Sequence, residues 1–258
     1  MIIDGHGHIS ATSFGSVEGY LAALAESGVD GGVVCAGGML DVRRMNDFVF
    51  GDKAPERRPR NDYVEQALRK HRSLAGLCFV DPTDPSAKDE LCRRLDQGFR
   101  GMFVSPLIHP FSFTDKALVA LCQICADRDL TVVSHNGWRP GSNTPDYASL
   151  AKAVPRCRFV LEHMGAPPAD VDARKAAAEL PNFYLETSLG SFLHIAETLK
   201  EAGAEKLVYG SEYPLSHPGV ELAKLLHLTL SDEERELIFC ENARRLFHLD
   251  LDAVRAGA

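Results

Sequence analysis

The sequence predicts an α/β fold, a (β/α)8 barrel of the TIM type that occupies residues 1–258 as a single domain. Two observations lead to this prediction. Eight short apolar runs rich in Val, Ile and Phe alternate with amphipathic segments of helical length along the 258-residue chain. Apolar strands that alternate with helices indicate a parallel sheet covered on both faces, and eight such units in about 250 residues fit a closed barrel.

The predicted strands are the apolar runs at residues 1–8, 31–35, 74–80, 99–104, 130–135, 158–163, 182–187 and 206–212. The predicted helices lie between them, at 16–28, 62–71, 86–98, 114–129, 146–154, 170–180 and 191–203. Several of these helices end in Gly, which is typical of a helix C-terminus. An open doubly wound sheet is the competing architecture, but no G-x-G-x-x-G segment follows the first strand.

One irregular region, residues 36–60, interrupts the alternation directly after the second predicted strand. In a barrel this loop would lie over the C-terminal face of the strands. Its arginines Arg57, Arg58 and Arg60 have two interpretations. They form a solvated loop, as charge runs usually do, or they belong to a lid that holds a substrate carboxylate through bidentate guanidinium contacts.

Composition excludes several classes of protein. The formal charge of -8 would repel a nucleic-acid backbone, so no nucleic acid is expected as a partner. Neither a signal peptide nor an apolar run of about 18 residues is visible, so we expect a cytoplasmic protein without a membrane contact. The seven scattered cysteines do not resemble a disulfide framework. Cys122 and Cys125 form a C-x-x-C inside an apolar helical pattern, which favours buried packing over a redox or zinc site.

Five polar residues stand near the C-terminal ends of four predicted strands. His6 and His8 alternate on the first strand and therefore share a face, because strand side chains point to opposite sides in turn. His135, His163 and Glu212 end the fifth, sixth and eighth strands. Barrel enzymes assemble their sites at this face, and imidazoles with a carboxylate are typical ligands of Zn²⁺. The pattern predicts one divalent metal ion, with zinc as the expected species.

The segments that surround these residues resemble the amidohydrolase superfamily, in the amidohydrolase-2 branch that includes the relatives of aminocarboxymuconate-semialdehyde decarboxylase. The resemblance covers nearly the whole chain apart from residues 36–60, and its segments are IIDGHGHI, GFRGMFVSP, LTVVSHNG, RFVLEHMG, NFYLETS, YGSEYP and ENARRLFHLDL. It implies a (β/α)8 barrel with a divalent metal. It also implies that His6, His8 and His135 are metal ligands, that His163 is catalytic or close to the metal, and that Glu212 is both ligand and general base.

Two positions depart from the family pattern. Phe103 stands where many relatives carry Lys, so a dinuclear centre bridged by a carboxylated lysine is not expected. Glu212 replaces the Asp of a G-S-D segment, and its extra bond adds about 1.5 Å of reach, which could move the carboxylate past the ligand position. Glu186 is an alternative acid, although a structural hydrogen bond is its simpler role. Glu162 adjoins His163 and is expected to point the other way.

Residues that follow the fourth and fifth strands are predicted to contact substrate, namely Ser105, His109, Asn136, Trp138 and Arg139. We expect the partner to be a small molecule, and a homo-oligomer is compatible with the sequence. The leading expectation is a metal-dependent hydrolase of a small amide, ester or lactone that carries a carboxylate. In it the metal lowers the pKa of a bound water toward about 7, Glu212 accepts the proton, and His163 orients the water or polarises the carbonyl. The alternatives are a metal-dependent decarboxylase of an unsaturated acid and a barrel without catalysis.

Overall fold

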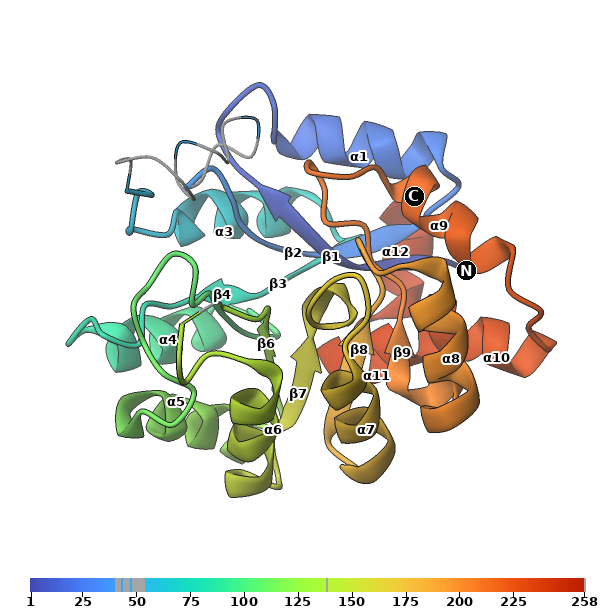
Figure 1. Ribbon diagram of the computed structural model, residues 1–258. Helices are drawn as coiled ribbons and strands as arrows, with labels where there is room; N and C mark the ends of the chain where they lie inside the picture. Colours follow the sequence, from blue (N-terminus) through green and yellow to red (C-terminus); the bar gives the residue numbers. More distant parts are fainter. Residues whose placement is uncertain (40–42, 44–46, 48–53, 138, 258) are drawn as a thin grey trace.

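The computed structural model describes residues 1–39, 43, 47, 54–137 and 139–257, which form a TIM barrel with the strands inside and the helices outside (Figure 1). All strand pairs are parallel. The strands are β1 (Ile3–Ile9), β2 (Gly31–Ala36), β3 (Leu74–Gly76), β4 (Cys78–Phe79), β5 (Gly101–Val104), β6 (Thr131–Ser134), β7 (Arg158–Leu161), β8 (Phe183–Glu186) and β9 (Leu207–Val208). The predicted (β/α)8 class is confirmed, and each predicted strand overlaps at least one observed strand.

The third predicted strand is divided in the structure. β3 pairs with β2, whereas β4 pairs with β5, so the sheet has a three-stranded part, β1 to β3, and a six-stranded part, β4 to β9. Between them the backbone N–H of Leu77 donates to the carbonyl of Val34 at 2.9 Å and keeps the two parts together. The sequence does not predict this division, because both halves of the predicted strand at 74–80 are equally apolar.

The barrel closes between its first and last strands. The N–H of Gly5 donates to the carbonyl of Tyr209 at 2.8 Å, and the N–H of His8 donates to the carbonyl of Tyr213 at 2.7 Å. A Cβ atom on Gly5 would lie 2.5 Å from Val208 Cγ1 and 2.8 Å from the Tyr209 carbonyl oxygen. Only glycine therefore allows the two chain segments to approach this closely.

All seven predicted helices are present. They are α1 (Val17–Glu26), α3 (Asn61–Lys70), α4 (Ala87–Asp96), α5 (Lys116–Asp127), α6 (Thr144–Ala153), α7 (Val171–Glu179) and α8 (Phe192–Ala202). The chain then adds α9 (Pro218–Leu226), α10 (Asp232–Glu236), a π-helical turn at Leu237–Glu241, α11 (Asn242–Phe247) and α12 (Leu251–Gly257). Local chemistry explains several starts, since Ser16, Asn143 and Ser231 each cap the first turn of the helix that follows.

Two smaller expectations can be compared with the structure. Cys122 and Cys125 are buried in α5, and all seven cysteines are free thiols, as the sequence predicts. Residues 40–42, 44–46 and 48–53 of the irregular loop lie outside the described residues. Among the helices that the structure describes, none has the length and apolar character needed to cross a bilayer.

Candidate functional site

A cavity of about 940 Å³ opens at the C-terminal ends of the strands. Its wall is largely apolar and includes Phe14, Met39, Phe79, Phe103 and Ile108. Polar side chains that stand near the ends of the strands also line it: His8, Ser105, His135, His163 and Glu212. The cavity lies at the face where barrel enzymes carry their sites, and it has the volume and the mixed lining of a small-molecule pocket.

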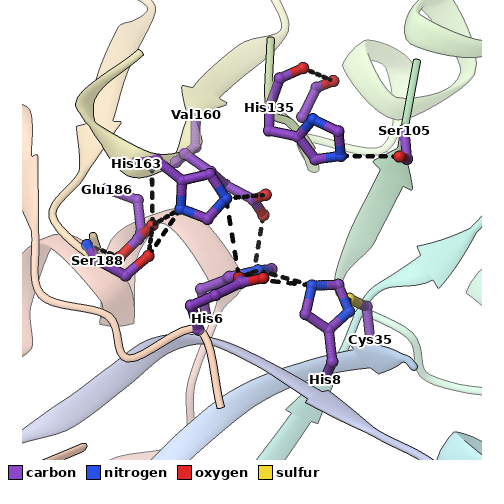
Figure 2. Close-up of polar contacts among 12 residues, drawn as sticks. His6, His8, Cys35, Ser105, His135, Val160, His163, Glu186 and Ser188 are labelled. Carbon is purple, nitrogen blue, oxygen red and sulfur yellow. Dashed lines mark hydrogen bonds and ion pairs between the residues drawn. The ribbon is translucent and has the colours of Figure 1, made fainter. Parts of the chain in front are cut away.

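His6 and His8 converge at the base of this cavity. The register of β1 against β2 shifts between Asp4 and Gly7, yet both rings still face inward. The two Nε2 atoms are 3.1 Å apart, and His6 Nε2 lies 2.6 Å from Glu212 Oε2. His8 Nε2 lies 3.5 Å from the same oxygen, so three potential ligand atoms from opposite ends of the chain point to one place. Figure 2 shows the rings of His6 and His8.

Glu212 reaches this group despite its departure from the family pattern. Its backbone has φ 54°, a left-handed conformation that is uncommon outside glycine, and its N–H donates to the carbonyl of His6 at 3.0 Å. This backbone turn, four residues after the end of β9, leaves room for the longer side chain. The extra bond of Glu therefore does not carry the carboxylate past the two histidines.

Glu162 points into the barrel, and the expectation that it points away is wrong. β7 ends at Leu161, and Glu162 to Met164 form a short 3-10 turn in which His163 has φ 60°. Strand alternation therefore stops before these residues, and both Glu162 and His163 turn inward. The carboxylate of Glu162 is fully buried, with Oε1 2.8 Å from His6 Nδ1.

Each of the two histidines has a second partner on its other ring nitrogen. Glu162 faces Nδ1 of His6, and the thiol of Cys35 lies 3.1 Å from Nδ1 of His8. Partners on Nδ1 orient an imidazole so that Nε2 is left to face a metal ion, which is the usual arrangement around protein-bound metals. No sequence pattern indicated a role for either partner, although Cys35 ends the predicted strand at 31–35 and Glu162 lies in the predicted strand at 158–163.

The electrostatics of the group favour positive charge. Burial alone would lower the pKa of His6, but the carboxylates of Glu162 and Glu212 raise it well above its ordinary value. For His8, burial lowers the pKa, while Cys35 and Glu212 raise it, with the same net direction. Burial raises the pKa of Glu212, but the neighbouring histidines hold it well below its usual range. The group therefore binds protons on its imidazoles, or a cation in their place.

The donor set fits a divalent metal ion. Both carboxylate oxygens of Glu162 and Oε2 of Glu212 are buried, and among the described residues their close partners are imidazole nitrogens rather than hydroxyl or backbone N–H donors. Tetrahedral bonds of about 2.0 to 2.2 Å place neighbouring ligand atoms about 3.3 to 3.6 Å apart. The separations of His8 Nε2 from His6 Nε2 and from Glu212 Oε2, 3.1 and 3.5 Å, are close to this range, whereas His6 Nε2 and Glu212 Oε2, 2.6 Å apart, would have to separate to admit the ion. Two possible ligand groups arise, one of His6, His8 and Cys35 and one of His6, Glu162 and Glu212.

His135 lies on the cavity wall but points elsewhere. Its Nδ1 donates to the carbonyl of Asn136 at 2.9 Å, and its Nε2 accepts from the hydroxyl of Ser105 at 2.7 Å. Burial lowers the pKa of His135, which keeps its ring neutral. Its role as a metal ligand stays a prediction, because its Nε2 is directed at Ser105 rather than at the group of His6, His8 and Glu212 (Figure 2).

The predicted substrate contacts divide into two sets. Ser105 and Asn136 line the cavity, whereas His109 and Arg139 are not among its described lining residues. His109 is buried against Phe79, and its Nε2 lies 2.7 Å from the carbonyl oxygen of Arg57. This contact fixes the irregular loop at Arg57. Arg139 is exposed to solvent, and Trp138 lies outside the described residues.

The arginine at the cavity is a different one from those the sequence singled out. Arg57, Arg58 and Arg60 are exposed and do not line the cavity. Arg43, from the same irregular loop, does line it, and its guanidinium stacks over the ring of Phe14 at 4.8 Å. No sequence pattern distinguished Arg43 from the other arginines of this loop.

His163 has a polar environment of its own behind the cavity wall. Its Nδ1 lies 3.0 Å from Ser188 Oγ, and its backbone N–H donates to Glu186 Oε2 at 3.3 Å. Glu186 also accepts from the hydroxyl of Ser188 at 2.7 Å, so the structural hydrogen bond expected for Glu186 is present. Burial raises the pKa of the Glu186 carboxyl to about 7.

Comparison with protein families and solved structures gives a consistent result. A family model described as Amidohydrolase matches residues 3–249, while the search of curated proteins found no match. The fold is similar to 2,6-dihydroxybenzoate decarboxylase from Rhizobium, with TM-score 0.70, 18% identity, and coverage of 96% of this chain and 99% of that chain.

Two further similar structures belong to a decarboxylase and to a probable hydrolase. A dihydroxybenzoic acid decarboxylase from Polaromonas sp. JS666, with bound manganese and 2-nitroresorcinol, has TM-score 0.71 and 17% identity, over 96% of this chain and 97% of that chain. A probable 2-pyrone-4,6-dicarboxylic acid hydrolase from Acinetobacter baumannii has TM-score 0.70 and 16% identity, over 96% of this chain and 99% of that chain. At these identities the likeness shows the fold.

The ligand geometry predicts that one equivalent of a divalent metal binds and that its affinity rises with pH, because binding must release protons from His6 and His8. Titration calorimetry with Zn²⁺ or Mn²⁺ in buffers of increasing pH measures both quantities. Replacing His6 and His8 together by Ala should abolish binding. Replacing His71 and His227, which lie away from the cavity, provides the matched control. Full metal content in the double variant of His6 and His8 would contradict the assignment.

Proposed function

The chain belongs to the amidohydrolase family, whose model spans residues 3–249, and from this premise we propose that it is a metal-dependent decarboxylase of a small aromatic or unsaturated carboxylic acid. The sequence alone favoured hydrolysis and kept decarboxylation as the alternative. The similar structures support that alternative better, since two of the three described above are decarboxylases of aromatic acids and one is a hydrolase. Zinc and manganese are both candidate metals for this chain, since the Polaromonas protein holds manganese.

The observation that supports decarboxylation most is the position of the ligand group against apolar walls. Phe103 lies between the ligand group and the apolar wall of the cavity, with its ring centre 5.8 Å from that of His6 and 4.6 Å from that of Phe79. A flat ring could pack against these aromatic side chains while one of its oxygen substituents faces His6, His8 and Glu212. Loss of CO₂ together with uptake of a proton converts a carboxylate anion into neutral products, and an environment poor in water favours these less charged products.

The residues of the chain account for the rest of the reaction. His6, His8 and Glu212 would hold a divalent metal ion, which would act as a Lewis acid toward an oxygen of the substrate. Decarboxylation breaks the bond between the ring carbon and the carboxylate, releases CO₂, and requires a proton on that carbon. His163 Nε2, 3.9 Å from Glu212 Oε2, is placed at the cavity to hold and deliver this proton.

A panel of substrates tests the proposal. We expect release of CO₂ from at least one of 2,6-dihydroxybenzoate, 5-carboxyvanillate and related phenolic acids by protein loaded with Zn²⁺ or Mn²⁺, followed as loss of the acid by chromatography. Chelation should abolish the activity, and readdition of the metal should restore it. Activity confined to lactones such as 2-pyrone-4,6-dicarboxylate, or unaffected by chelation, would contradict the proposal.

Hydrolysis is the second candidate, and one observation favours it. Two groups that can accept a proton, Glu212 Oε2 and His163 Nε2, lie side by side at the ligand group, an arrangement suited to activating a water molecule. The same panel separates the two reactions, because hydrolysis opens a lactone and releases no CO₂. A barrel without catalysis is disfavoured by the convergence of His6, His8 and Glu212.

The position of Glu212 predicts the effect of two substitutions. Glu212→Gln keeps the shape but removes a charged ligand, so kcat should fall about 10²-fold or more while the protein stays folded. Glu212→Asp withdraws the carboxylate by about 1.5 Å from His6 and His8, so activity and metal affinity should also fall. Both are measured with the active acid and by calorimetry. An Asp variant that equals or exceeds the wild type would show that the site is not adapted to Glu.

The cavity lining predicts that Arg43 selects anionic substrates. Arg43→Ala should raise KM for a carboxylated substrate about tenfold or more, because a charge-assisted hydrogen bond is lost, with metal content unchanged. The control is the triple replacement of Arg57, Arg58 and Arg60 by Ala, which removes more charge from the same loop but none from the cavity wall. A KM that rises only in the triple variant would reverse the assignment in favour of the lid.

A further inference from the structure

Ser188 and Glu186 stand behind His163, outside the cavity, and both are almost completely buried. Ser188 Oγ lies 3.0 Å from His163 Nδ1 and 2.7 Å from Glu186 Oε2. The backbone N–H of Ser188 donates to the other oxygen of Glu186 at 2.5 Å, and the N–H of His163 donates to Oε2. Figure 2 shows the side chains of Ser188 and Glu186 on the side of the His163 ring that faces away from His8.

The directions of these hydrogen bonds follow from the number of protons available. The two backbone groups can only donate, so above the Glu186 pKa of about 7 both oxygens of its ionised carboxylate act as acceptors. The hydroxyl of Ser188 has one proton, and it donates that proton to Glu186. Ser188 Oγ can then only accept from His163, which requires the proton of the neutral imidazole to be on Nδ1.

An opposing influence acts on the other ring nitrogen. His163 Nε2 lies 3.9 Å from Glu162 Oε2 and 3.9 Å from Glu212 Oε2. Two carboxylates on this side attract the single ring proton toward Nε2. The contact of Nδ1 with Ser188 is shorter by almost one ångström, and it is a direct hydrogen bond, so it prevails.

We propose that Ser188, oriented by Glu186, is a positioning residue that holds His163 in the tautomer with the proton on Nδ1 and so leaves Nε2 open toward the cavity. The proposal rests on the proposed function, in which His163 carries a proton to the substrate carbon. With a proton on Nε2, the neutral ring would have to become an anion in order to deliver it. With Nε2 open, His163 takes up a proton at the cavity, becomes a cation, and returns to the neutral ring when it protonates the carbon.

The left-handed backbone of His163, with φ 60°, contributes to the same orientation of its ring. It turns the ring so that one edge meets Ser188 and the other meets the cavity. Strain of this kind persists where neighbouring contacts hold it, and here the N–H of His163 is held by Glu186.

The tautomer can be read directly by NMR from protein labelled with ¹⁵N-histidine and loaded with Zn²⁺, which is diamagnetic. Long-range ¹H–¹⁵N spectra are recorded about two units above the ordinary imidazole pKa of about 6.5. The signal of His163 is identified by its loss in His163→Gln. We expect a protonated Nδ1 and an unprotonated Nε2 in the wild type, a shift of the proton to Nε2 in Ser188→Ala, and restoration of Nδ1–H in Ser188→Thr.

Activity gives a second readout. Ser188→Ala should lower kcat about tenfold or more with little change in KM or zinc content, because Ser188 does not line the cavity, and Ser188→Thr should recover most of it. Ser73→Ala, which alters a buried serine at the opposite end of the strands, is the matched control. A wild-type ring with its proton on Nε2, or an unchanged tautomer in Ser188→Ala, would overturn the proposal. The tautomer is read without substrate, so this result does not depend on which acid the enzyme decarboxylates.

Discussion

The hydrogen-bonded seam between β1 and the chain after β9 is the constraint on which the site depends. Asp4 is buried there and accepts hydrogen bonds from the N–H of His6, the hydroxyl of Tyr20 and the N–H of Ser211. Burial raises the pKa of Asp4 to about 6, against the opposing effect of these donors. The same seam bonds the N–H of Glu212 to the carbonyl of His6, so closing the barrel and assembling the ligand group are one event. Residues from the two ends of the chain thereby form one group at 2.6 to 3.5 Å.

The fold was predictable from the sequence because its signals are local. Each strand is a short apolar run and each helix has its own amphipathic pattern and cap, so the periodicity alone places all eight units. The division of the third strand at Leu77 was not predictable, because it follows from which neighbour each half pairs with. The irregular loop could be located but not interpreted, since its charge run is compatible with a solvated loop and with a binding site, and the arginine at the cavity is Arg43.

The site was predictable as far as strand alternation holds. His6 and His8 lie on one face of a regular strand, and they converge as the pattern indicates. At His163 and Glu212 the backbone adopts a positive φ that no sequence rule assigns to these residue types. This is why Glu162 turns inward against expectation and why Glu212 reaches the histidines without overshooting. Ser188 ends the segment NFYLETS, whose resemblance to the family assigns it no role, so only the three-dimensional contact with His163 reveals it.

The two acids that distinguish this centre act on different sides of His6. Glu212 faces Nε2 and can share a cation with it, whereas Glu162 faces Nδ1 and sets the orientation of the ring. Buried carboxylates destabilise a fold unless a positive charge compensates them, and both of these acids are buried with imidazoles as close partners. A site of this kind is stable only with protons or a metal ion among its ligands. The longer acid at position 212 and the inward turn at position 162 are therefore parts of one charge balance, which protons on the imidazoles or a bound cation would complete.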